Sequence, residues 1–242
     1  MKQKMMILTA LIATIALCSA CRMNIKNDKS EPLTLKYSKT FGEIAAFERI
    51  SIDGVCRVIY VQGDSTSVRA RYSKAEDAEL ISVKSDGEML QINVKEPKNA
   101  IKRKKGNILI YVTSPDLIGV ALSGIGSFKT KGTLDTDTLR LNMEGVGSIK
   151  IPSLICDRLQ AKVAGVGSIQ LSDVTAQETQ LSMNGVGNIK VENFQNSGSV
   201  HCTMEGVGSI KLGGEVQNFS NYVNGVGSID AKDLKIKELG KQ

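Results

Sequence analysis

Six near-copies of one short glycine motif recur along the second half of the chain at an almost constant spacing. Each copy reads Gly-x-Gly, then Ser or Asn, then Ile or Phe, and the first glycines stand at positions 124, 145, 165, 185, 206 and 225. A nearly fixed period of this size predicts a repeat architecture in which each unit stacks on its neighbours. The copies are Gly124–Phe128, Gly145–Ile149, Gly165–Ile169, Gly185–Ile189, Gly206–Ile210 and Gly225–Ile229.

The residues around each motif alternate between apolar and polar with a period of two. In the second copy, Leu139, Leu141 and Met143 alternate with polar residues, which is the pattern of a strand. Helical repeats are excluded by the glycines and the short period, and the Asn ladder of a leucine-rich repeat is missing. We therefore predict an all-β chain that forms a parallel β-helix (a β-solenoid) of about six coils, each of ~20 residues. Stacked inward columns are expected, such as Leu122, Leu141, Ala161, Leu181 and Cys202.

The domain organisation follows from where this pattern begins and ends. Residues 47–236 are predicted to form a single β-helix domain, with the repeat coils in 116–236. Residues 47–115 also alternate as strands, with a tight turn at Asp86-Gly87, and are expected to be irregular β structure that caps the first coil. The last residues, LKIKELGKQ, are expected to cap the other end as a helix or loop, with a tail over 237–242.

The first twenty residues read as a signal for export. Lys2 and Lys4 precede an apolar run over Met5–Leu17, which is too short to span a bilayer as a mature helix. Cys18-Ser19-Ala20-Cys21 follows and resembles a lipobox, although Cys18 stands where Leu is usual. We predict a lipoprotein signal peptide over 1–20 and acylation (palmitate and related chains) of Cys21, with an ordinary secretory signal as the alternative.

Residues 21–46 are then the lipid anchor and a polar tether. No Asp follows Cys21, which permits sorting to the outer membrane. The expected location is the cell envelope, with the membrane as a partner through the lipid anchor and with the periplasmic or surface face left open.

Composition and charge disfavour several classes of function. Trp is absent and aromatic residues make up 4% of the chain, which is poor for a deep ligand pocket or for stacking on bases. The formal charge of +6 falls to +4 once Lys2 and Lys4 are removed, so no nucleic-acid partner is predicted. The basic run Lys102–Lys105 adjoins Gly106 and is interpreted as a solvated loop.

The cysteines left after export are Cys56, Cys156 and Cys202. None shows the close spacing of a zinc site. Cys56 and Cys202 fall on apolar positions of their strands, so we expect them to be buried thiols that act as small apolar residues, with one disulfide left open as an alternative.

Catalytic, metal and cofactor sites are not predicted. The glycine motif is not a nucleotide-binding loop, since that loop needs one strand-to-helix turn and a downstream acid rather than six copies on strands. Glu144 and Glu205 share one register but lie three coils apart, about 14 Å at sheet spacing, too far to cooperate. The only histidine, His201, has outward parity and no acid beside it.

Two columns of side chains within the motif are the candidate binding surface. The residue between the glycines is apolar in every copy and the residue after the second glycine is Ser or Asn. Strict alternation exposes both columns, and an exposed apolar stripe usually marks a contact surface; a turn at the glycines would bury the apolar column instead. The valine ladder comprises Ile125, Val146, Val166, Val186, Val207 and Val226, and the serine ladder comprises Ser127, Ser148, Ser168, Asn188, Ser209 and Ser228.

The opening Phe47-Glu-Arg-Ile-Ser-Ile-Asp-Gly54, the segment Val58–Asp64 and the Gly-x-Gly copies from Ser123 onward resemble the putative auto-transporter adhesin, head GIN domain family. The resemblance covers about residues 43–236. It implies a right-handed β-helix and an adhesin-like role, and it supplies no catalytic residues. The predicted function is a non-catalytic binding or adhesion module for a glycan or an envelope protein. The alternatives are a polysaccharide-active lyase or hydrolase, and a structural protein that forms homo-oligomers along the valine ladder.

Overall fold

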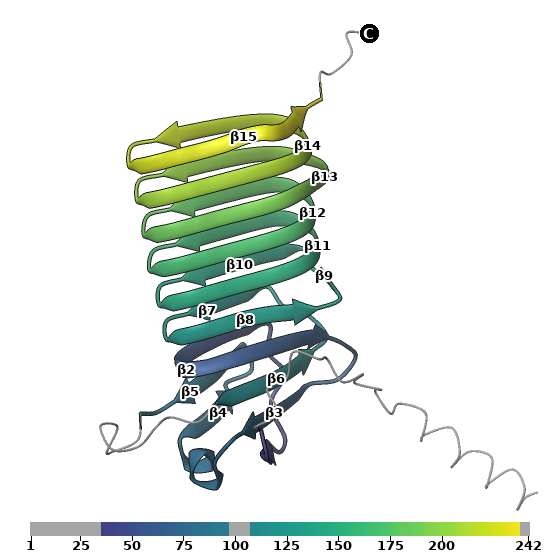
Figure 1. The fold of residues 1–242 in the computed structure, drawn as a ribbon. Helices are drawn as coiled ribbons and strands as arrows, with labels where there is room; N and C mark the ends of the chain where they lie inside the picture. Colours follow the sequence, from purple (N-terminus) through teal and green to yellow (C-terminus); the bar gives the residue numbers. More distant parts are fainter. Residues whose placement is uncertain (1–34, 97–106, 238–242) are drawn as a thin grey trace, which may run out of the picture. The chain divides into compact units, whose positions relative to one another are not determined.

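The computed structural model of the protein describes residues 35–96 and 107–237, and most of these residues belong to strands of one large sheet (Figure 1). Within these ranges the helical residues are confined to one 3-10 turn, η2 (Ala75–Glu79). The strands are β1 (Tyr37–Thr40), β2 (Arg49–Gln62), β3 (Ser67–Tyr72), β4 (Ile81–Ser85), β5 (Met89–Val94), β6 (Ile108–Ser114), β7 (Gly119–Leu122), β8 (Ile125–Lys131), β9 (Thr133–Asp135), β10 (Thr138–Met143), β11 (Val146–Val163), β12 (Val166–Met183), β13 (Val186–Met204), β14 (Val207–Val223) and β15 (Val226–Ile236).

Successive repeat units lie directly over one another as parallel strands. β11 pairs with β12 from Val146↔Val166 to Val163↔Met183, and β13, β14 and β15 continue the stack. In Figure 1 the front strands run to the right and the rear strands to the left while the chain climbs, so the solenoid is right-handed. The predicted all-β parallel solenoid of about six coils is confirmed.

The interior of the solenoid is a set of apolar columns, one residue from each coil. Ile149, Ile169 and Ile189 occupy one column and are completely buried. Burying such a side chain contributes about 1.5–3 kcal/mol, but only a neighbouring coil can cover it, so coils stabilise each other rather than themselves.

One predicted inward column needs a correction at its first member. Leu141, Ala161, Leu181 and Cys202 do share a column, but Leu141 pairs with Val120, while Leu122 lies beside Met143. The interval from the first motif to the second is one position longer than the interval that follows it. This longer interval places Val120 rather than Leu122 one coil below Leu141.

The first coil of the solenoid is β2, far from the repeats in sequence. β2 pairs in parallel with β7 and with β8, and its Val55 lies beside Ile125. Gly54-Val55-Cys56 therefore occupies the place of a Gly-x-Gly motif, with Cys56 beside Gly126. This copy is hard to recognise in the sequence because Gly54 lies several repeat periods before Gly124 and because Cys replaces the second glycine.

The strands below β2 close the first end of the core, as predicted, but with an unforeseen order. β5 and β6 pair in parallel with the two halves of β2, and β4 and β3 then pair with β5 and β6 in antiparallel fashion. The antiparallel strands end the parallel stack on this side.

Part of the predicted tether over 21–46 is folded. β1 pairs with β3 as an antiparallel edge strand, Leu35 is buried, and the Arg71 guanidinium donates a hydrogen bond to the Leu35 carbonyl. Apolar Leu35 and Phe41 pack against the cap, which is why this segment is ordered. The predicted signal peptide over 1–20, the acylation site Cys21 and the basic run Lys102–Lys105 lie outside the described residues.

The other end of the solenoid differs from expectation too. Leu234 to Ile236 extend strand β15 instead of forming a helix or a loop, because they pair with Gly214 to Val216 of the coil below. The rest of the predicted cap, 238–242, lies outside the described residues. Figure 1 shows β15 as the last coil of the stack.

Candidate binding surface

The Gly-x-Gly motifs form one edge of the solenoid, where each coil turns from its rear side to its front side (Figure 1). A Cβ on Gly165 would lie 2.1 Å from the carbonyl oxygen of Gly145, and one on Gly167 would lie 2.0 Å from that of Gly147. Neither distance is compatible with a side chain, so both glycines are required for the backbones of adjacent coils to approach this closely.

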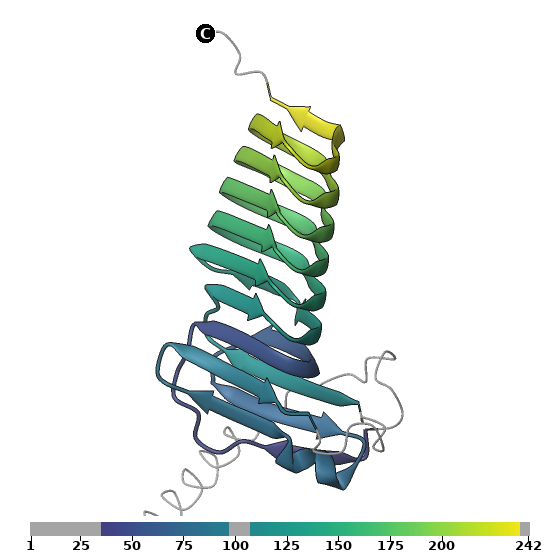
Figure 2. The ribbon, with the colours of Figure 1, turned by 90° about the vertical axis from the view of Figure 1, so that its left-hand side faces the viewer.

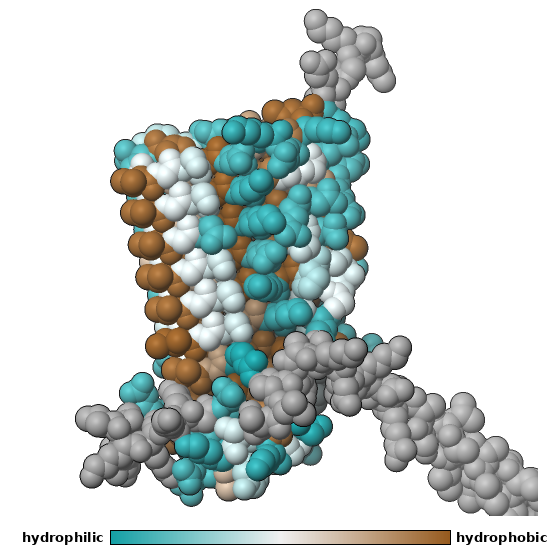
Figure 3. Space-filling view, viewed as in Figure 1, coloured by the Kyte–Doolittle hydropathy of each residue, from teal (hydrophilic) through white to brown (hydrophobic). Residues whose placement is uncertain are grey.

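The tight turn exposes the residue between the two glycines. The members of the valine ladder form an apolar column along this edge, seen in brown at the left of Figure 3. Figure 2 turns the same edge of the ribbon toward the viewer. At about 4.8 Å per coil, six members span about 24 Å. Their exposed fractions are 54% for Ile125, 48% for Val146, 50% for Val166, 48% for Val186, 47% for Val207 and 73% for Val226.

The serine ladder runs beside the valine ladder on the front side of the coils. Ser148 and Ser168 pair in register and are half-buried, and Asn188 extends further into solvent. The two ladders together present methyl groups next to hydroxyl and amide groups. Such a surface can make apolar contacts and donate or accept hydrogen bonds to the same ligand.

The register of this edge is kept even where the length of the coil changes. The longer interval after Gly185 places its extra residue near Asn196, which has a φ of +50°, and the register shifts of β13 fall between Val191 and Ser197. The buried Ser197 hydroxyl fills this bulge, since it donates to the Val174 carbonyl and accepts from the Ala176 N–H. Length variation is therefore absorbed away from the glycine edge, and the ladders stay aligned.

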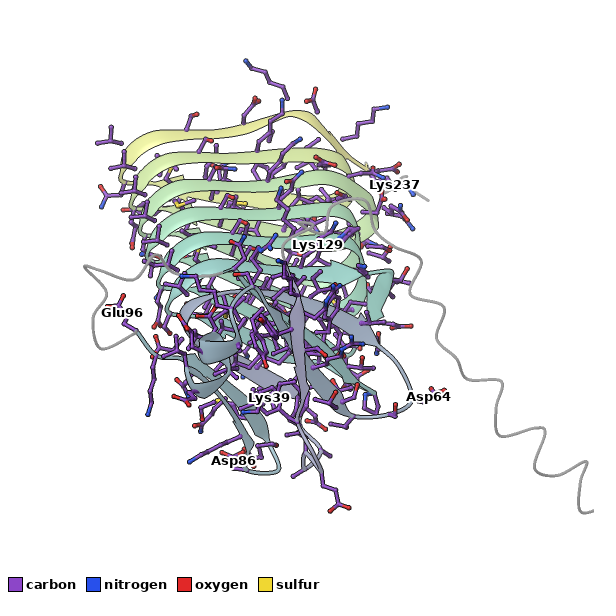
Figure 4. The ribbon with its side chains drawn as sticks, turned by 60° about the horizontal axis from the view of Figure 1, so that its bottom comes forward. Lys39, Asp64, Asp86, Glu96, Lys129 and Lys237 are labelled. Atoms are coloured by element: carbon purple, nitrogen blue, oxygen red, sulfur yellow. The ribbon has the colours of Figure 1, made fainter. Side chains whose placement is uncertain are left out.

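A partly basic column follows the serine ladder on the same side of the coils. Lys129, labelled in Figure 4, is exposed and begins it. Further along, Lys190 pairs with Glu192 at 2.7 Å and Lys211 pairs with Asp233 at 3.4 Å. The Lys190 ammonium and neighbouring hydrogen bonds lower the pKa of Glu192. The column is Lys129, Lys150, Gln170, Lys190, Lys211 and Asp230, a mixed surface rather than an anion site.

Glu144 and Glu205, the two carboxylates that share one register on the rear side, are each held by an amide and not by each other. Asn184 donates to Glu205 at 2.5 Å, and Asn142 donates to Glu144 at 2.7 Å. His201 is exposed and forms hydrogen bonds with the hydroxyl groups of Ser220 and Thr203. Within residues 35–96 and 107–237, no three His, Cys, Asp or Glu side chains are placed to hold a metal ion.

Cys56 and Cys202, which were predicted to be buried, are buried, and so is Cys156. Burial raises the pKa of the Cys156 and Cys202 thiols to about 12. A buried, protonated thiol is a poor nucleophile and a poor metal ligand. Cys156 and Cys202 therefore contribute packing, and each carries a free thiol.

One residue of the candidate surface was missed. Val55 of β2 continues the valine ladder below Ile125 and is half-buried. The signal for it was the sequence Gly54-Val55-Cys56, which keeps the apolar residue and the first glycine of the motif.

Comparison with known proteins agrees with this architecture. A family model described as putative auto-transporter adhesin, head GIN domain matches residues 46–197 and again 171–240. No curated protein matches the chain.

Several solved structures share the fold. A putative adhesin from Bacteroides fragilis is 27% identical, with a TM-score of 0.65 over 81% of this chain and 98% of that one. A putative adhesin from Parabacteroides merdae is 18% identical, with a TM-score of 0.51 over 83% and 96% of the two chains. A putative lipid binding protein from Parabacteroides distasonis is 15% identical, with a TM-score of 0.50 over 84% and 96%. The last two likenesses concern the fold alone.

Proposed function

The chain belongs to the putative auto-transporter adhesin, head GIN domain family, and we propose that it is a non-catalytic binding module of the cell envelope whose contact surface is the valine ladder with the adjoining serine ladder. The family and its adhesin-named structural relatives support an adhesion-like role.

The observation that carries this proposal is the exposure of branched apolar side chains in an unbroken column. Single exposed apolar residues are normal on a protein surface, whereas a contiguous apolar stripe usually marks an interaction site. Val166 and Val186, in the middle of the column, are each about half exposed. The glycine turns hold their backbone in place, so little ordering is needed when a partner binds.

The chemistry of the ladders favours a protein partner over a glycan. Binding sites for sugars commonly stack aromatic rings on the ring faces, and aromatic residues are 4% of this chain and absent from both ladders. Valine methyls spaced at about 4.8 Å fit an extended apolar segment of a protein, and the serine hydroxyls can bond to its polar groups. A glycan is the second candidate, because the hydroxyl and amide column could bond to sugar hydroxyls.

A position on the cell envelope fits this role. The predicted acylation of Cys21 would anchor the module to the outer membrane, with residues 22–34 between the anchor and the folded part. In the described part of the chain, none of the helical segments has the length and apolar character needed to cross a bilayer.

The proposal is tested by a matched pair of variants. Val166→Lys with Val186→Lys places two charges in the middle of the ladder. Ile155→Lys places a single charge at an exposed apolar residue, 45% exposed, on another side of the coils, and Val186→Lys alone is its single-charge counterpart on the ladder. Binding of the labelled protein to envelope extract and to intact cells is measured for the unaltered protein and all three variants, with a glycan array in parallel.

We expect the ladder variant to lose binding and the Ile155 variant to keep it. Equal binding by the ladder variant would refute the assignment of the surface. Hits on the glycan array that the ladder variant loses would replace the protein partner with a glycan. Release of oligosaccharides from a panel of polysaccharides would overturn the non-catalytic role.

A further inference from the structure

In the last coil of the solenoid, apolar residues are exposed at positions that are buried in the coils below. Ile229 and Ile236 are partly and largely exposed, whereas Ile210 and Val216, directly below them, are fully buried. On its outer side β15 has no partner strand in the described residues. An edge strand with its own unpaired backbone groups and an apolar inner side is a template for pairing with another strand.

The sequence of β15 is complementary to itself when read in the opposite direction. In an antiparallel pair of β15 strands centred between Lys232 and Asp233, each charged residue faces the opposite charge and each apolar residue faces an apolar residue. The facing pairs are Ile229 with Ile236, Asp230 with Lys235, Ala231 with Leu234, and Lys232 with Asp233, each formed twice. Opposite charges and apolar residues directly across a pair of strands are favourable, and like charges are not.

The backbone directions agree with the same register. The N–H group of Val226 donates to the carbonyl of Gly206, just before β14, and that of Lys237 donates to the carbonyl of Val216 in β14. Both residues therefore direct their backbone groups down the stack. The backbone N–H and C=O groups of successive strand residues point alternately to the two sides of the strand. Counted from Val226 and from Lys237, the backbone groups that point away from β14 are those of Ile229, Ala231, Leu234 and Ile236. These are the residues that face each other in the proposed register, so their free N–H and C=O groups would form the hydrogen-bonded pairs.

The bend in β15 lies at the centre of this register. Lys232 and Asp233 are consecutive and both exposed, and the pairing with β14 shifts between Lys211 and Gly213. A two-fold axis through this bend brings the first half of β15 in one copy opposite the second half of β15 in the other copy. The bent strand can therefore pair along both of its halves. Asp233, already 3.4 Å from Lys211, would then also face Lys232 of the second copy.

From these observations we propose that β15 is a dimerisation edge, through which two copies of this chain join end to end with their last coils antiparallel. The partner is a second copy because the complementarity is isologous: the same stretch, Ile229 to Ile236, supplies both sides. The surface is separate from the valine ladder, and the proposal does not rest on the proposed function. The dimer would place the two capped ends at its far ends and align the two solenoids.

Charge reversal with rescue tests the register. The association of the protein is measured by sedimentation over a wide range of concentration. Asp230→Lys places like charges opposite Lys235 twice in the dimer, and we expect about tenfold weaker association. Adding Lys235→Asp restores opposite charges and should restore association. Val186→Lys, on the valine ladder, should leave it unchanged.

Disulfide trapping provides a readout that does not depend on affinity. Asp230 and Lys235 form a non-hydrogen-bonded pair in the proposed register, where Cβ atoms are closest. A mixture of the Asp230→Cys and Lys235→Cys proteins should form a cross-linked dimer under mild oxidation, whereas Lys232→Cys mixed with Lys235→Cys should not. The native cysteines of the folded part are buried and do not compete.

A protein that is monomeric at all concentrations and gives no cross-link would overturn the proposal. So would a dimer that Val186→Lys abolishes and the charge reversal leaves intact, because that result places the contact on the valine ladder. Cross-linking in both mixtures alike would refute the register.

Discussion

The repeat coils, β7 to β15, and the N-terminal region, β1 to β6, share one apolar core, yet their strands find their partners in different ways. A repeat coil pairs with the next coil along the chain, in parallel and almost residue for residue. In the N-terminal region the Tyr60 hydroxyl bonds to Ser114, 54 residues away, and the Gln62 amide bonds to Asp135, 73 residues away. The repeats therefore carry their structure locally, whereas the cap depends on contacts between distant segments.

The solenoid therefore has one end that the cap strands cover and one end that is uncovered. β2 begins the coil stack. β5 and β6 pair with it in parallel, and β4 and β3 then end the stack with antiparallel pairs. At the other end, β15 repeats the coil pattern with nothing in the described residues above it. Repeat proteins commonly need distinct end caps because their inner columns are apolar, and this is the physical basis of the dimerisation edge proposed above.

The largest effect is expected from a glycine inside the repeat coils. Gly167→Ala puts a Cβ 2.0 Å from the Gly147 carbonyl oxygen, a backbone atom that cannot move without separating two coils. We expect a loss of about 3 kcal/mol or more in the free energy of unfolding. Gly42→Ala, where a Cβ meets nothing within 4 Å, is the control and should be close to neutral. Urea unfolding followed by circular dichroism measures both.

A second pair of glycines tests whether β2 is a true coil of the solenoid. Gly54→Ala puts a Cβ 2.0 Å from the Val94 carbonyl oxygen, at a φ of +87°. Gly87 has a similar φ of +96° in a hairpin turn, but a Cβ there meets nothing. We expect Gly87→Ala to cost about 1 kcal/mol from backbone strain and Gly54→Ala clearly more. Equal losses would contradict the close packing of β2 on the cap.

The contact that joins the first coil to the cap is tested at Tyr60. Its buried hydroxyl bonds to the Ser114 carbonyl at 3.1 Å and to the Ser114 hydroxyl at 3.0 Å. Tyr60→Phe should cost about 1–2 kcal/mol, because buried Ser114 groups lose a partner. Val58→Ala, a neighbouring buried change that removes no hydrogen bond, separates packing loss from hydrogen-bond loss.

The same tyrosine gives the N-terminal region a dependence on alkaline pH. Burial raises the pKa of Tyr60 to about 12 from its ordinary value of 10.0. Above pH 10 the unfolded chain loses this proton while the folded chain keeps it, so stability is full below pH 10 and falls between about pH 10 and pH 12. The difference between the protein and Tyr60→Phe should shrink over that window, which unfolding at a series of pH values measures. A constant difference would contradict the raised pKa.

The smallest effect is expected from exposed ion pairs, and it should not distinguish the two regions. Arg158 contacts Glu178 at 2.9 Å between coils, with side chains 53% and 44% exposed, and Arg49 contacts Glu88 at 3.8 Å in the cap. Arg158→Ala and Arg49→Ala should each cost less than about 1 kcal/mol, and less at high salt. A large loss at Arg158 would mean that surface pairs, rather than inner columns, hold the coils together.

Much of the repeat could be predicted because its evidence is local and repeated. The alternation around Leu141 indicated strands, and the nearly fixed period placed Val166 over Val146. The cap could not be predicted in the same way. Nothing near Gly54 indicates that the coil above it begins at Gly124, and closing such a long loop depends on which register buries the most apolar surface. The tether prediction was wrong at Tyr37–Thr40 for the same reason, since only strand β3 makes this segment an edge strand.

The candidate surface was predicted in part from the sequence, and in part it was decided only by the tertiary structure. The sequence by itself determined the coil, its period, the inward column from Leu141 onward and the ladder residues from Ile125 and Ser127 onward, because each of these repeats at a nearly fixed spacing. Whether the valine ladder lies inside or outside was decided only by the tertiary structure, because glycine allows the chain to turn either way. Adjacent coils lie so close at this edge that a Cβ at either glycine would meet a carbonyl oxygen. The two glycines make this close turn possible, and in it the valine between them points outward.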